Sequence, residues 1–221
     1  MTALTQPVRF ADVGEAADLA AFLARLIHYD KAAAVRLQAG GGALAVFGRP
    51  ASFEVLAIRT ARLAQQQETF DVTVSAGELL EAIDESAGGA VVPAAVTGPP
   101  WAGVLPPRGG WQQVPGLPGS QAVRRFVSGA VAEFRAQVEE LEPEKRTRSE
   151  LDRIGRVIWS RPVGDTELPV RAAHAAQSVG FLRPESELAL LSAGAWLRLR
   201  TPYGSIAVRR AGLGALSVTP T

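Results

Sequence analysis

Residues 98–119 form a segment rich in glycine and proline, and this segment constrains the fold more than any other feature. Its sequence is GPPWAGVLPPRGGWQQVPGLPG, in which 12 of 22 residues are Gly or Pro. Proline fixes φ and lacks an N–H group, while glycine adds backbone freedom, so no long helix or strand is expected within it. The segment therefore divides the chain into two parts, residues 1–97 and 120–221.

The bulk composition indicates a folded protein. Hydrophobic residues make up 47% of the 221 residues, which is enough for a core and too much for a disordered chain. No apolar run is long enough to cross a bilayer, and the first residues lack the pattern of a signal peptide. The abundance of Ala, Arg and Gly is typical of bacteria with GC-rich genomes. We therefore expect a bacterial protein of the cytoplasm without a membrane segment.

Charge is divided unevenly along the chain, although the net charge is only +1. Residues 1–119 hold 8 Lys+Arg and 11 Asp+Glu, which gives −3. Residues 120–221 hold 15 Lys+Arg and 11 Asp+Glu, which gives +4. The positive half favours an anionic partner, while ordinary surface charge is the simpler interpretation.

Motifs for catalysis and for metal binding are largely missing from the sequence. The absence of cysteine excludes disulfides, zinc ribbons and thiol catalysis. His28 and His174 lack the spacing of a metal site, so neither a metal nor a cofactor is expected. The run Gly40–Gly42 lacks the Lys of a phosphate-binding loop, so it is interpreted as a tight turn. His174 is either a partly buried structural residue or a general base.

The N-terminal part alternates between helical and strand-like patterns. Asp12 and Glu15 form a capping motif before a run of apolar residues at helical spacing, and Ser75 and Glu78 form another after a strand-like run. The segment 53–63 is interpreted as a central strand, with a helix as the competing interpretation. The other predicted elements are a helix at 13–28, a hairpin of strands at 32–38 and 43–48, a strand at 69–74, a helix at 76–85 and a strand at 90–96.

The C-terminal part is predicted to contain three helices and then strands. Ser120 and Ser149 are expected to cap the first two helices. The first helix carries an apolar stripe, which is expected to pack against the N-terminal part and to form part of a homodimer contact. The predicted helices span 120–141, 149–160 and 168–179, and the strands span 187–192, 195–201 and 205–210.

These patterns together predict an α+β fold with an N-terminal antiparallel sheet and helices. The C-terminal unit is predicted to be helical and to end in a β-hairpin. Residues 1–97 would form an α+β subdomain, 98–119 a connecting loop, and 120–221 the helical subdomain with its hairpin.

The final hairpin has the most specific prediction. Pairing of Thr201 with Gly204 across a turn puts four apolar side chains on the buried side, whereas a bulge at Gly204 would break this pattern. Trp196 would then lie opposite Arg209 as a cation–π pair. The buried set is Leu197, Leu199, Ile206 and Val208, and the set facing solvent includes Trp196, Arg198, Arg200 and Arg209.

Two groups of residues are candidates for binding. The first group lies in the Gly/Pro segment, where a long loop is usually functional or a linker, unless its tryptophans merely pack on the two halves. The second lies on the outer side of the hairpin, where arginines beside an aromatic ring are suited to phosphates, unless the face is merely solvated. The candidates are Trp101, Arg108 and Trp111 in the segment and Trp196, Arg198, Arg200 and Arg209 in the hairpin.

The order of two helices and a basic hairpin is also that of winged-helix modules, although the helix at 168–179 is poor in DNA-reading side chains. The sequence resembles an uncharacterised protein family of actinobacteria in three short segments, Arg108–Trp111, Trp196–Leu199 and Thr201–Gly204. That resemblance implies a host lineage and no activity. Residues 70–83, FDVTVSAGELLEAI, resemble the strand and capped helix found in DNA sliding clamps, and no functional residue follows from this similarity.

Two functional hypotheses remain. The first is a non-enzymatic binding or assembly protein with weak affinity for nucleic acid, for another anionic partner or for an unknown protein. The second is an enzyme with a site between the halves, roofed by residues 98–119, with His174 or a carboxylate as base. A cleft with a carboxylate beside His174 would favour the enzyme, and an apolar surrounding would favour the binding protein.

Overall fold

The structure is a computed structural model that describes residues 6–210. This part of the chain consists of helices and antiparallel strands, which confirms the predicted α+β class. The helices are α1 (Val13–Tyr29), α2 (Ala76–Glu81), α3 (Ser120–Glu140), α4 (Arg148–Trp159) and α5 (Val170–Ser178), with 3-10 turns η1 (Pro100–Gly103) and η2 (Pro143–Lys145). The strands are β1 (Pro7–Arg9), β2 (Ala34–Gly40), β3 (Ala43–Gly48), β4 (Leu56–Arg62), β5 (Phe70–Ser75), β6 (Ile83–Asp84), β7 (Gly89–Val91), β8 (Gln112–Val114), β9 (Ala189–Ala193), β10 (Trp196–Thr201) and β11 (Gly204–Arg209).

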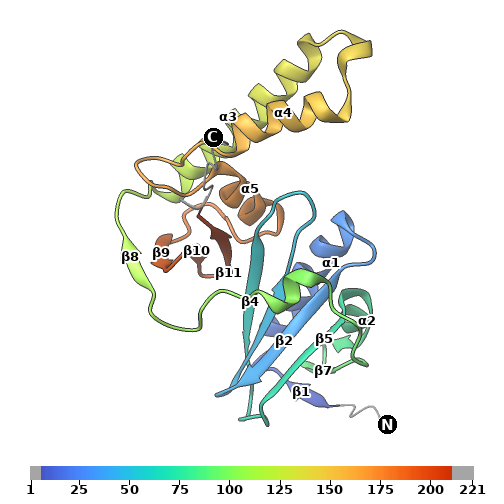
Figure 1. The fold of residues 1–221 in the computed structure, drawn as a ribbon. Helices are drawn as coiled ribbons and strands as arrows, with labels where there is room; N and C mark the ends of the chain where they lie inside the picture. The colour runs from blue at the N-terminus through green and yellow to red at the C-terminus, as the bar shows by residue number, and fades with distance from the viewer. Residues whose placement is uncertain (1–5, 211–221) are drawn as a thin grey trace, which may run out of the picture.

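The described strands form two antiparallel sheets. Eight strands form a large sheet in the order β5-β2-β3-β4-β11-β10-β9-β8, and β1, β7 and β6 form a small one. The large sheet continues from the N-terminal part into the C-terminal part, because Leu56 and Ile58 of β4 pair with Ala207 and Ser205 of β11. In Figure 1, β4 lies next to the β10–β11 hairpin. The sequence patterns did not predict this junction.

Local sequence signals explain most of the N-terminal elements. Asp12 caps α1, because its Oδ1 accepts a 3.0 Å hydrogen bond from the backbone N–H of Glu15. Ser75 caps α2 in the same way through its hydroxyl. Gly41 and Gly42 have φ angles of 59° and 78° and form the two-residue turn between β2 and β3. Such a turn requires positive φ, which glycine adopts without strain.

Two predicted capping residues and one predicted helix end are wrong. α3 begins with Ser120, and its cap position is Gly119, which provides no side-chain hydrogen bond. α4 is capped by Thr147, whose hydroxyl accepts from a backbone N–H three residues on, and not by Ser149. Both Thr147 and Ser149 have the chemistry of a cap, so only the backbone path separates them. α2 ends at Glu81, because the chain turns there into β6.

The core lies between one face of the large sheet and the helices that cover it. α1 packs on β4 and α5 packs on β11, and the buried side chains form one continuous apolar cluster. α3 packs against α4 and α5, so the prediction that it packs against the N-terminal part is wrong. Figure 1 shows α3 and α4 as a helical hairpin that extends away from the sheet.

A charged cluster connects α1 to the sheet. Arg59 of β4 has a side chain only 9% exposed, and its Nη2 lies 2.9 Å from Glu15 Oε2 and 3.2 Å from Asp18 Oδ2. Arg62 reaches the other oxygen of Glu15 at 2.8 Å. A buried guanidinium needs such partners, because an unpaired charge in the core would cost several kcal/mol.

The register of the β10–β11 hairpin is the predicted one. Thr201 pairs with Gly204, and Trp196 pairs with Arg209. The alternative with a bulge at Gly204 is therefore wrong. The four side chains that the pattern assigned to the buried side, Leu197, Leu199, Ile206 and Val208, are each at most 1% exposed.

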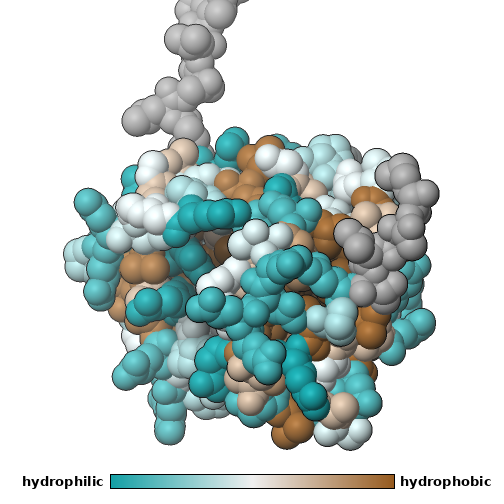
Figure 2. All heavy atoms as spheres, turned by 90° about the horizontal axis from the view of Figure 1, so that it is seen from below, coloured by the Kyte–Doolittle hydropathy of each residue, from teal (hydrophilic) through white to brown (hydrophobic). Residues whose placement is uncertain are grey.

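Polar residues separate the apolar ones on the surface seen in Figure 2. Within residues 6–210, no helix combines the length and the apolar character that crossing a membrane would require.

Candidate anion-binding face of the large sheet

Six of the seven candidate residues lie on, or against, the face of the large sheet that α1 and α5 leave uncovered. The register of β10 and β11 places the hairpin residues there, opposite in direction to the buried leucines. The segment after β7 brings two tryptophans onto the same face. We call this surface the tryptophan–arginine face and define it by Trp101, Trp111, Trp196, Arg49, Arg198, Arg200 and Arg209.

Arg198 is held against Trp111. Its Cζ lies 5.6 Å from the centroid of the indole, and its Nε donates a 2.8 Å hydrogen bond to Ser205 Oγ. Trp111 Nε1 donates in turn to the carbonyl of Pro107 at 3.0 Å, which orients the ring. Burial, and then the charge of neighbouring Arg200, lower the pKa of Arg198. Arg198 is half-buried, whereas the sequence predicted that it faces solvent.

A small cleft lies between Trp101 and Trp196. Its volume is about 190 Å³, and Arg49 and Arg209 line it together with Leu56. The Cζ atom of Arg209 lies 5.3 Å from the ring centroid of Trp196, as the predicted cation–π pair requires. The cleft is smaller than typical pockets for whole ligands, so it suits a single planar ring or a single phosphate.

Among the described residues, the arginines of this face form no ion pair with a carboxylate. Arg36 on β2, by contrast, binds Asp71 with an N–O distance of 2.6 Å. Glu54 also lines the cleft, and within residues 6–210 it forms no ion pair. Guanidinium groups without partners offer planar sets of donors to phosphate or carboxylate. Within residues 6–210, no ion pair involves Arg49, Arg198, Arg200 or Arg209.

The Gly/Pro segment crosses the sheet. Trp101, in η1, packs against an apolar cluster on the outer face, and Arg36 Nη1 donates to the carbonyl of Ala102. The segment then supplies β8, which pairs with β9 at the edge of the sheet. Trp101 and Trp111 are thus both half-buried. The cluster under Trp101 consists of Phe47, Leu56, Ile58 and Ala207.

Arg108 is exposed, and it lines neither the cleft nor the stack on Arg198. It follows Pro107, whose carbonyl accepts the hydrogen bond from Trp111. The hydrogen bond from Arg36 is the main reason why the pKa of Asp71 is lowered, and the charge of Arg108 adds to it.

Sequence reasoning missed Arg49 and overrated the winged-helix order. Arg49 follows β3 in the chain. It lines the same cleft as Arg209 only because β4 pairs with β11, and no local pattern indicates this pairing. The helix that would read DNA in a winged-helix module is α5, which instead packs on β11. Its alanines Ala172, Ala173, Ala175 and Ala176 are completely buried, so one side of the helix is taken up by packing.

His174 lies among aromatic rings. Its imidazole centroid is 5.1 Å from that of Phe53 and 5.0 Å from that of Trp159, and burial lowers its pKa. This is the apolar surrounding that favours a binding protein. In the part of the chain that the structure describes, no three His, Asp or Glu residues group into a candidate metal site.

Two family profiles match the sequence. Residues 3–103 match a profile described as "Domain of unknown function (DUF8010)", and residues 106–213 match one described as "Domain of unknown function (DUF8185)". Most of the chain is thus similar to domains of unknown function. The two matches meet within the Gly/Pro segment. No curated protein matches the chain.

Several solved structures share a weak likeness with this fold. A DNA polymerase sliding clamp from Pseudomonas aeruginosa has a TM-score of 0.49 and 11% identity, and the match covers 92% of this chain and 64% of that one. The DNA polymerase III subunit beta from the same organism has a TM-score of 0.48 and 12% identity, with coverage of 88% and 62%. This chain therefore spans less than two thirds of the length of these proteins.

Proposed function

We propose that the protein is a non-enzymatic binding protein whose tryptophan–arginine face holds nucleic acid, with single strands preferred over duplexes. The observation that carries the proposal is the cleft between Trp101 and Trp196, with Arg49 and Arg209 beside it. An aromatic ring with nearby guanidinium groups can stack a base and neutralise the adjacent phosphate.

The preference for single strands follows from the shape of this face. A base must leave the duplex to stack on a tryptophan, and a cleft of about 190 Å³ between two indoles accepts one ring. Arg198 and Arg200, on alternate residues of β10, then provide positive charge along one direction of the sheet. Such contacts recognise the backbone and give little sequence specificity.

The enzyme hypothesis has less support. Its proposed base, His174, has Phe53 and Trp159 as ring neighbours and a pKa lowered by burial. We place the protein in the cytoplasm of an actinobacterial host, with residues 1–97 and 120–221 as two subdomains joined by residues 98–119.

Fluorescence anisotropy with labelled oligonucleotides at low salt tests the proposal. We expect a single-stranded probe to bind more tightly than a duplex of the same length. The double variant R200A/R209A should bind more weakly, because both side chains are exposed and their loss removes charge without opening the core. Contacts to three phosphates would give a log–log salt slope of about −2, at about 0.7 per phosphate of a single strand.

A matched control removes the same charge elsewhere. Arg135 on α3 and Arg156 on α4 are exposed and lie outside the tryptophan–arginine face, so R135A/R156A should bind like the unchanged protein. If both double variants lost the same amount of affinity for the oligonucleotide, net charge and not the tryptophan–arginine face would explain the binding. The absence of binding at low salt would refute the proposal.

A further inference from the structure

α3 has a face that no other described element covers. On the inner side of the helix, Val123 and Val127 are completely buried. On the outer side, Arg125, Phe126 and Gly129 are exposed, and the exposed fraction of Phe126 is 44%. Phe126 lies next to an apolar groove, so its exposed ring adds to a larger apolar surface. We call this face the α3 outer face and define it by Ala122, Arg125, Phe126, Gly129, Glu133 and Ala136.

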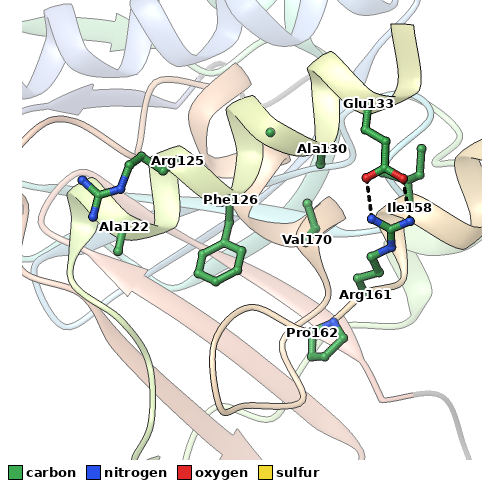
Figure 3. Close-up of a pocket in the computed structure, with 10 residues that line it drawn as sticks. Ala122, Arg125, Phe126, Ala130, Glu133, Ile158, Arg161, Pro162 and Val170 are labelled. Carbon is green, nitrogen blue, oxygen red and sulfur yellow. Dashed lines mark hydrogen bonds and ion pairs between the residues drawn. The ribbon is translucent and has the colours of Figure 1, made fainter. Parts of the chain in front are cut away.

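A groove runs beside the α3 outer face. It has a volume of about 530 Å³ and lies between α3, the end of α4 and the start of α5. Figure 3 shows Phe126 pointing into the groove beside Val170, with Pro162 on the far wall. Arg161 and Glu133 form a 2.5 Å ion pair at one end.

The residues of the α3 outer face are arranged symmetrically about Gly129. Ala122 and Ala136 lie seven residues before and after it, which is about two helical turns, so all three share one line along the helix. Arg125 and Glu133 lie four residues before and after it, and they have opposite charges. The face is therefore complementary to itself when a second α3 runs antiparallel to the first across a two-fold axis at Gly129.

In that arrangement Arg125 lies at the height of the partner's Glu133, and Glu133 at the height of the partner's Arg125. The hydrogen bond from Arg161 lowers the pKa of Glu133, so its carboxylate stays charged. The small side chains at positions 122, 129 and 136 allow two helix backbones to approach closely. A partner helix would then lie along the groove and cover Phe126.

Gly129 itself supports a close approach. Glycine weakens a helix interior relative to alanine, so its presence there needs a reason. Among residues 6–210, no atom outside the neighbouring helix backbone lies within 4 Å of the place that a Cβ atom at position 129 would take, so packing among these residues does not require glycine. We propose that α3 is a homodimer interface, on which a second copy of this chain docks antiparallel about Gly129. This inference is independent of the nucleic-acid proposal, because the two surfaces share no residue.

Light scattering after size exclusion, over a series of concentrations, measures whether the full chain of 23.3 kDa approaches twice that mass. We expect it to do so, and we expect G129L to remain monomeric at the same concentrations. The leucine separates the two backbones, its Cβ atom meets no atom of residues 6–210 outside the neighbouring helix backbone, and it removes a helix-weakening glycine. Thermal unfolding should therefore show G129L to be at least as stable as the unchanged protein. A monomer at every concentration, or a dimer of G129L, would overturn the proposal.

Charge reversal provides a sharper test. R125E places a second carboxylate at the height of the partner's Glu133, and E133R places two guanidinium groups together, so each variant alone should be monomeric. An equimolar mixture of the two variants restores an opposite-charge pair and should form a heterodimer. If the mixture of the two variants stayed monomeric, Arg125 and Glu133 would not face each other across an interface, and that result would also overturn the proposal.

Cysteine cross-linking gives the position of the axis. The natural chain has no cysteine, so G129C carries the only thiol. This residue faces its own copy at the two-fold axis, and we expect oxidation to join two chains rapidly. R135C, on a side of α3 turned about 120° from Gly129, is the control and should cross-link slowly. Equal rates for both variants would contradict the antiparallel arrangement.

Discussion

Burial changes the protonation behaviour of His174 more than any nearby charge does. The ring lies between Phe53 and Trp159, and desolvation is the cause of its lowered pKa. The imidazole therefore favours its neutral form in the folded protein. The residue belongs to the packing between α5, α4 and the segment before β4, so its protonation is linked to stability.

This linkage predicts a pH dependence of stability. Between the lowered folded pKa and the ordinary value of 6.5, the unfolded chain binds more protons than the folded chain. The free energy of unfolding should therefore rise with pH through this range and level off above about pH 7. Urea unfolding of H174F at a series of pH values should show a flatter profile. H28Q serves as the control, and an unchanged slope in H174F would contradict the assignment.

At the scale of elements, the β10–β11 hairpin separates structural from binding side chains by simple alternation. Leu199 is completely buried and pairs with Ile206 and Leu190, whereas the next residue, Arg200, is exposed. Adjacent positions on one strand thus have opposite roles.

Alanine substitutions on this hairpin should differ accordingly. L199A leaves a cavity in the core and should lower the free energy of unfolding by about 2–5 kcal/mol. R200A should change it by less than about 0.5 kcal/mol, because its side chain is exposed and forms no ion pair within residues 6–210. Chemical denaturation measures both values. A loss of stability in R200A as large as that in L199A would contradict the register.

At the scale of the whole molecule, the pairing of β4 with β11 unites the two parts of the chain. Leu56, Phe47 and Ala207 form a buried cluster across this junction, and Trp101 covers it. This continuous sheet couples the two proposed subdomains to each other.

We therefore expect the two parts to unfold in one cooperative transition. All four tryptophans lie at or after position 101, so their fluorescence reports on the C-terminal half and the covering segment, whereas circular dichroism reports on both halves. The two unfolding curves should coincide, and L56A should shift them together. Two separated transitions would show that the junction is weak.

The sequence alone determined the elements whose signals are local. Asp12 and Ser75 are caps because their side chains reach a backbone N–H three residues away. The Gly41–Gly42 turn and the register of the last hairpin follow from positive φ and from alternation. These interactions join residues that are close in the chain, so the pattern contains the necessary information.

Tertiary structure decided the rest, because it depends on pairs that are distant in the chain. Leu56 pairs with Ala207, and Arg49 lines a cleft with Arg209, only because two strands about 150 residues apart in the sequence are neighbours in the sheet. The same pairing lets the Gly/Pro segment cover the sheet and leaves Arg198 half-buried under Trp111. The sequence of an amphipathic helix does not tell whether its apolar stripe packs on the sheet or on other helices. The stripe of α3 packs on α4 and α5.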